Sequence, residues 1–106
     1  MVEIPDLLCQ MVRERRMVSL SGANDPPGSA RIAEPHAVYI GSNNRGFVDF
    51  YQVGGTSRSG KLPGWRRFAL SDVIAVQPLE QRFQPRPDYR PENRGFYRAF
   101  VCTSES

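Results

Sequence analysis

Residues 54–62 read GGTSRSGKL, one residue away from G-x-x-x-x-G-K-[ST], the phosphate-binding loop of nucleotide hydrolases. In that loop, glycines let backbone N–H groups face the phosphates, a Ser or Thr holds Mg²⁺, and a helix begins after the lysine. Here Leu62 takes the Ser/Thr position, and Pro63 and Gly64 lead into a β-like segment where the helix should start. We therefore predict that this loop hydrolyses no nucleotide.

The same stretch carries cations that suit a different kind of site. Arg58 and Lys61 lie in the loop, Arg66 and Arg67 follow it, and no acid occurs within residues 57–67. One interpretation is an anion-contact surface, with Arg58 and Lys61 as a secondary basic loop, because guanidinium groups bind phosphate well. The other is a solvated hairpin loop whose cations only aid solubility.

Catalytic and metal-binding constellations cannot be assembled from the other residues. The chain has 1 histidine, His36, and no Ser-His-Asp or Cys-His spacing. Its acids Glu34, Asp49 and Asp72 form no evident pair for general acid–base chemistry. No His/Cys cluster has metal-ligand spacing. The sequence therefore predicts a protein that is not an enzyme, with no catalytic residue, no cofactor and no metal.

Length and charge set the general class. The 106 residues suffice for one domain, and the net charge of +3 permits an anionic partner without requiring one. Residues 1–6 do not resemble a signal peptide, and no apolar stretch approaches the ~20 residues of a membrane span. We expect a cytoplasmic protein without membrane contact. Cys9 and Cys102 are expected to be reduced thiols.

The elements that must position the candidate residues are short. Ile4–Arg16 repeats apolar side chains at helical spacing, which predicts one helix that packs across an open end of the barrel or, alternatively, binds a partner. Nine Gly and nine Pro favour turns and short strands elsewhere. Strands are predicted over residues 18–21, 31–41, 47–53, 65–70 and 73–79. The predicted core is Ile32, Val38, Ile40, Phe50, Phe68, Leu70, Ile74 and Val76.

Two regions follow from this pattern. Residues 1–83 form a mainly β domain, a small and strongly bent antiparallel sheet or barrel with one N-terminal helix. Residues 84–106 form a proline- and aromatic-rich tail, in which prolines argue against a central strand. Its aromatic residues are too many for simple disorder, so the tail either folds back on the barrel or contacts a neighbouring subunit.

Three segments in this order resemble the WYL domain family: RIAEPHAVYI (31–40), GFVDFYQ (46–52) and WRRFALSDVIAVQPLEQRF (65–83). The family pattern is R-x-x-x-P before a strand, a second strand, and then R-x-F-x-L-x-x-I-x-x-V ending in a Phe. The resemblance covers about residues 4–83. Two positions depart from it, because the Trp-Tyr-Leu signature is not present as such and Asp72 stands where a basic residue is usual.

The resemblance implies an SH3-like, Sm-like antiparallel barrel of bacterial transcription regulators, which senses a nucleotide or single-stranded nucleic acid in a basic pocket. Carried onto this chain, it implies Arg31, His36, Tyr51, Arg66 and Arg67 as ligand-binding residues, and a transcription-regulator partner. The alternative is a protein-interaction module, such as a homodimer, with no small ligand. The two differ in salt dependence, since phosphate contacts weaken steeply with salt.

Overall fold

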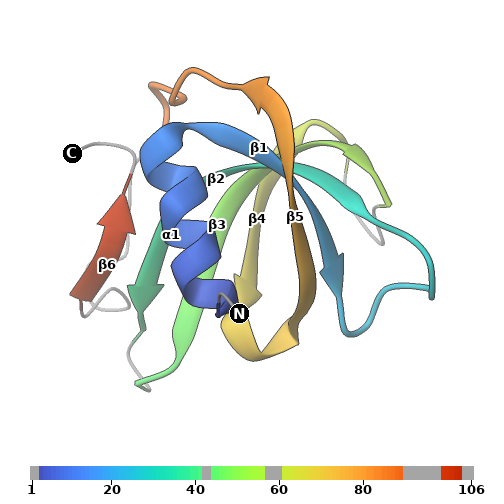
Figure 1. Cartoon of the computed structure of the whole chain (residues 1–106), viewed down its shortest axis with the longest axis horizontal. Helices are drawn as coiled ribbons and strands as arrows, with labels where there is room; N and C mark the ends of the chain where they lie inside the picture. Colours follow the sequence, from blue (N-terminus) through green and yellow to red (C-terminus); the bar gives the residue numbers. More distant parts are fainter. Residues whose placement is uncertain (1–2, 42–43, 57–60, 90–98, 104–106) are drawn as a thin grey trace.

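One antiparallel sheet and one helix make up the parts of the chain that the computed structural model describes, residues 3–41, 44–56, 61–89 and 99–103 (Figure 1). The mainly β prediction with an N-terminal helix is therefore confirmed. The elements are α1 (Ile4–Glu14), β1 (Arg16–Gly22), β2 (Arg31–Ile40), β3 (Gly46–Gly55), β4 (Gly64–Ala69), the 3₁₀ turn η1 (Leu70–Asp72), β5 (Val73–Arg82) and β6 (Ala99–Thr103).

The strands follow the order β4-β3-β2-β1-β5, so four strands form a meander and β5 returns to pair with β1. Within the described ranges, no pairing joins the edge strands β4 and β5, and the sheet is not closed into a barrel. Strand β2 pairs with β3 along its whole length. Its other edge pairs with β1 at residues 31–33 and with β6 at residues 37–40.

A bulge in the middle of β2 decides which of its side chains face the helix. The register with β3 shifts between Pro35 and Ala37, so His36 is the extra residue. Ala33 and Val38 are an odd number of positions apart, yet both belong to the core beneath α1. His36 and Ala37 therefore both face the opposite side, and the bulge brings Val38 back to the core.

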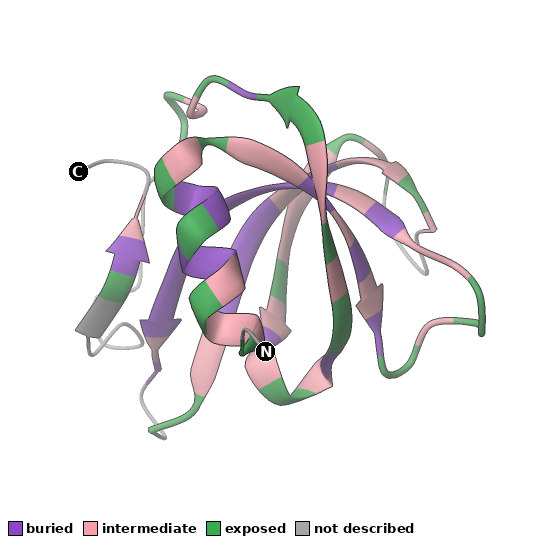
Figure 2. Cartoon of the chain, in the orientation of Figure 1, coloured by how far each residue is buried: buried purple, intermediate pink, exposed green. Residues whose placement is uncertain are grey.

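Helix α1 packs against β1, β2, β5 and β6 and buries one face on the sheet (Figures 1 and 2). Pro5 lies in its first turn, and Arg15, with φ 57°, ends it in the left-handed conformation. The core between helix and sheet contains a large cluster of apolar side chains. Its fully buried members are Leu8, Met11, Val12, Val18, Leu20, Ala33, Val38, Val48 and Phe50.

The core prediction holds best on the central strands. Val38 and Phe50 are buried, and the other predicted core residues except Ile74 are half-buried. Ile74 is 62% exposed, so its assignment to the core was wrong. The physical reason is alternation on an edge strand: Val73 is buried in the core, and the next residue, Ile74, therefore points outward.

The prediction of two reduced thiols is also wrong, because Cys9 and Cys102 form a disulfide with a Cα–Cα distance of 5.7 Å. It links α1 to β6, a strand that was not predicted. The two cysteines are 93 positions apart in sequence, but both elements pack against β2.

Within the described residues, no helix has both the length and the apolar character needed to cross a bilayer.

Candidate functional site

The predicted site residues do not converge on one surface. Arg31 lies beneath Phe68 on the helix side of the sheet, whereas His36 and Tyr51 lie with Trp65 on the opposite face. We call the face that carries His36, Tyr51 and Trp65 the outer face. The adjacent residues of β4, Arg66 and Arg67, alternate between the two sides, as side chains of a strand must.

The structure describes only one of the two residues of the secondary basic loop. Arg58 lies outside the described residues. Lys61 is exposed, and its carbonyl oxygen accepts a hydrogen bond from Nη2 of Arg66 at 3.4 Å. The Arg66 guanidinium also donates through Nη1 to the carbonyl of Trp65 at 2.9 Å, so this cation is partly engaged by backbone.

The phosphate-loop motif has a structural explanation in this chain. Strand β4 begins at Gly64, directly after Lys61, Leu62 and Pro63, and no helix follows the lysine. Gly55 has φ 81°, and a Cβ there would clash with the carbonyl of Ala30. That glycine is therefore required by the close approach of β3 to the start of β2, not by a phosphate.

Arg31 is the most constrained of the predicted residues. Its Nε and Nη2 donate to the two carboxylate oxygens of Asp25 at 2.9 and 2.7 Å, and its Nη1 donates to Oε1 of Gln52 at 2.9 Å. The guanidinium lies 4.8 Å from the centre of the Phe68 ring. Asp25 comes from the turn after β1 and also accepts the N–H of Gly22 at 3.3 Å. Arg31 is thus one partner of a buried ion pair, and its side chain also lines a pocket.

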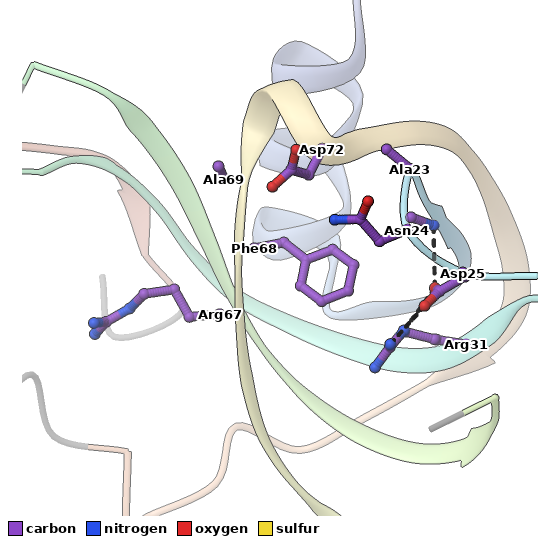
Figure 3. A pocket seen from close by; sticks show the side chains of 9 residues that line it. Ala23, Asn24, Asp25, Arg31, Arg67, Phe68, Ala69 and Asp72 are labelled. Carbon is purple, nitrogen blue, oxygen red and sulfur yellow. Dashed lines mark hydrogen bonds and ion pairs between the residues drawn. The ribbon is translucent and has the colours of Figure 1, made fainter. Parts of the chain in front are cut away.

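That pocket has a volume of ≈ 280 Å³ (Figure 3). It is lined by Gly22, Ala23, Asn24, Asp25, Arg31, Arg67, Phe68, Ala69 and Asp72. An arginine has five N–H donors, and Arg31 uses three of them on described residues, which leaves one donor on each terminal nitrogen. The Asp72 carboxylate makes no hydrogen bond or ion pair within the described ranges. Its backbone carbonyl accepts the N–H of Ala23 at 2.7 Å, which fixes its place on the rim.

The histidine belongs to a buried cluster of the outer face. The backbone N–H of Arg86 donates to Nε2 of His36 at 3.0 Å, so that nitrogen carries no proton. Nδ1 therefore donates to the carbonyl of Glu34 at 2.8 Å. Burial lowers the pKa of His36 below its ordinary value of 6.5, and the ring is neutral.

The aromatic rings around His36 are also engaged. Trp65 packs edge-on against His36 and Tyr51, with ring centroids 4.8 and 5.0 Å apart. Arg86 covers the Tyr51 ring at 4.0 Å and binds both carboxylate oxygens of Glu34 at 3.0 and 3.2 Å. The stacking face of Tyr51 is thus occupied by a residue of the tail.

Arg67 takes part in a second polar network on the outer face. The buried Asp49 accepts hydrogen bonds from the Tyr39 hydroxyl at 2.8 Å, the Tyr89 hydroxyl at 3.0 Å and Nε of Arg67 at 3.1 Å. Arg67 thereby neutralises a buried carboxylate, and in Figure 3 its guanidinium points away from the Arg31 pocket. Its role in the fold is sufficient to explain its position.

Sequence reasoning missed the partners contributed by two turns. Asp25 lies in a segment whose composition predicts only a turn, and Arg86 lies in the tail. The one available signal is the spacing of Phe83, at the end of the predicted domain, and of Arg86 and Tyr89 in the tail, since all three contact His36. The tail therefore folds back on the sheet through residue 89. Two further aromatic residues of the tail, Phe96 and Tyr97, lie outside the described residues.

Comparison with known proteins gives this chain no relative. No protein-family model matches it, no curated protein matches it, and no solved structure matches it.

Proposed function

We propose that this chain is a non-enzymatic, WYL-like binding module that holds a nucleotide or short single-stranded nucleic acid at the Arg31 pocket. The observation that carries the proposal is a buried arginine that lines a pocket of ≈ 280 Å³ and uses three of its five N–H donors on described residues. The order of the three WYL-like segments supports the family, and the return of β5 to β1 supports an SH3-like, Sm-like curvature. As such a module, the chain would act with a transcription regulator.

This proposal moves the site away from the basic surface that the sequence favours. Arg67 is committed to Asp49, and Arg86 covers Tyr51, so a phosphate chain lying on the outer face would have to displace both contacts. Arg31 needs no such displacement, because it already lines a cavity. The expected salt dependence is therefore shallow, with few phosphate contacts.

We propose a protein without catalytic activity because His36 and Asp49, on the outer face, are already hydrogen-bonded. Both ring nitrogens of His36 are hydrogen-bonded inside a buried cluster, and the Asp49 carboxylate accepts hydrogen bonds from Tyr39, Tyr89 and Arg67. A general base must reach the proton that it abstracts. These two groups are sequestered, so they are poor candidates for that role.

The cytoplasmic location is part of the same proposal, and the disulfide argues against it. Disulfides persist in oxidising compartments and are rare in cytosolic proteins. Blocking thiols in intact native cells, followed by mass measurement of the purified protein, decides the matter. Two blocked cysteines support the cytoplasm, whereas an unmodified Cys9–Cys102 pair places the protein in a non-reducing setting.

A second candidate function, protein interaction, is favoured by one observation. The large apolar side chains of Ile74 and Val101 are 62% and 53% exposed, on β5 and β6. Strand β5 is the edge of the main sheet order, and an exposed sheet edge can pair with a partner's strand or with a second copy of the chain. Sedimentation equilibrium over a range of concentrations tests the homodimer directly.

The ligand proposal is tested by titrating nucleoside monophosphates and a labelled single-stranded oligonucleotide into the protein at low and moderate salt. Arg31→Lys keeps the charge but loses the planar fork, and we expect at least about tenfold weaker binding. Phe68→Leu is a second pocket variant, and Arg13→Lys, on the exposed side of α1, is the matched control. The proposal fails if no probe binds at low salt. Binding that ignores both pocket variants but is lost in Arg66→Ala/Arg67→Ala returns the site to β4.

A further inference from the structure

Two acids and two arginines line the Arg31 pocket, but only one of the arginines has its guanidinium beside the acids (Figure 3). Asp25 neutralises Arg31 through two hydrogen bonds, the shorter of them 2.7 Å. Asp72 then adds a carboxylate that has no partner in the described part of the chain, while the Arg67 guanidinium points away (Figure 3). A phosphate entering this pocket would face an uncompensated carboxylate, which is unfavourable. The group that enters should therefore be the uncharged part of a nucleotide.

The polar groups of the pocket determine which hydrogen-bonding groups a ligand must present. Arg31 offers two donors on neighbouring nitrogens of one plane, so it calls for hydrogen-bond acceptors. Asp72 offers two acceptor oxygens, so it calls for N–H donors. The Phe68 ring forms a flat apolar wall, with Asn24 and Asp72 on one side of it and the Asp25–Arg31 pair on another (Figure 3). The matching ligand is flat and carries acceptors on one edge and donors on another.

Among the common bases, guanine fits this description best. Its O6 and N7 are adjacent acceptors, which arginine reads with paired N–H groups. Its N1–H and N2 amino group are adjacent donors, which suit the two oxygens of one carboxylate. Adenine and cytosine present an amino donor next to an acceptor, so neither offers a carboxylate two adjacent donors.

We propose that the Arg31 pocket is a guanine-base subsite, in which Arg31 donates to O6 and N7 and Asp72 accepts from N1–H and N2–H. This inference rests on the proposed function, and it names the part of the ligand that the pocket takes. It also gives a reason for the acidic residue in the segment LSDVI, where the WYL-like pattern usually has a basic one.

The test is a set of ¹⁵N-resolved NMR titrations with guanosine, inosine, adenosine, cytidine and guanosine monophosphate. Guanosine should bind most tightly and shift the amide signals of Gly22, Asn24 and Asp72. Inosine lacks the N2 amino group and should bind at least about tenfold more weakly, since it forfeits a hydrogen bond to a charged acceptor. Guanosine monophosphate should gain little over guanosine.

Asp72→Asn should remove the preference for guanosine over inosine, while Asp6→Asn, an exposed carboxylate on α1, should leave it intact. The amide spectrum of each variant without ligand shows that it is folded. If no nucleoside or nucleotide shifts any amide, the proposed function fails and this inference with it. If nucleotides bind and Arg31→Lys weakens them, but guanosine has no advantage or Asp72→Asn keeps it, only the guanine subsite is overturned.

Discussion

The buried ion pair between Arg31 and Asp25 should be among the most costly to break in this molecule. The two side chains are 5% and 3% exposed, and Arg31→Met would leave the Asp25 carboxylate without two of its donors. Breaking one side of a buried pair costs about 3–5 kcal/mol, because an uncompensated charge remains. The buried Gln52 oxygen would also lose its Arg31 donor, which adds about 1–3 kcal/mol if nothing replaces it. Against a typical total stability of about 5–15 kcal/mol, the variant should be marginally folded.

The assay is urea unfolding followed by the fluorescence of Trp65, the chain's 1 tryptophan. The surface pair Arg16–Glu14 is the matched control, because its atoms lie 3.6 Å apart and its side chains are 29% and 35% exposed. Glu14→Gln should cost less than about 1 kcal/mol.

A double variant, Arg31→Met/Asp25→Leu, separates the charge effect from packing. It removes both partners, so it should be more stable than the sum of the two single losses implies, with a coupling of about 0.5–3 kcal/mol. An Arg31→Met loss no larger than that of Glu14→Gln, or strictly additive losses, would show that the pair is not buried and coupled as the geometry requires.

Three further predictions concern the disulfide, the histidine and the exposed edge. Reducing the Cys9–Cys102 bond, which joins residues 93 positions apart, should lower the free energy of unfolding by about 2–5 kcal/mol; unfolding with and without reductant measures it, and equal midpoints refute it. Because burial lowers the pKa of His36, the unfolded chain binds the proton more readily; His36 should therefore lower stability as pH falls below 6.5 and have no effect above that value. Thermal midpoints together with the imidazole titration check this sign, and an imidazole pKa above 6.5 contradicts it. Ile74→Ser should change stability by less than about 0.5 kcal/mol, whereas Phe50→Ala should cost about 3–5 kcal/mol in the same unfolding assay; comparable losses would place Ile74 back in the core.

The meander could be predicted because its signals are local. The strands β2 and β3 consist of β-branched and aromatic runs bounded by glycine and asparagine, and the sequence predicts both within a few residues. Strand β6 could not be predicted in this way, because its partner β2 is far away in sequence and nothing in the proline-rich tail marks the pairing. The disulfide could not be predicted for the same reason, because Cys102 lies on β6.

The candidate site shows where residue type alone is insufficient. The separation of Arg66 and Arg67 follows from the period of a strand, so their convergence on one phosphate was improbable from the sequence itself. The ion pair of Arg31 could not be predicted, because it depends on the side chain of Asp25 in an irregular turn. Which way a turn side chain points is set by tertiary packing, and the sequence carries no periodic signal for it.

The link between α1 and β6 has a consequence for the order of events during translation. Cys9 leaves the ribosome 93 residues before Cys102, which at typical elongation rates is a delay of about 5–20 s. Throughout that interval Cys9 is a thiol without its partner, while the helix and the first five strands are already available to pack. The bond can therefore form only after every residue of α1 and of strands β1 to β5 has been made. A ribosome stalled before Cys102 would leave a nascent chain with a single thiol, able to form a mixed disulfide with another protein.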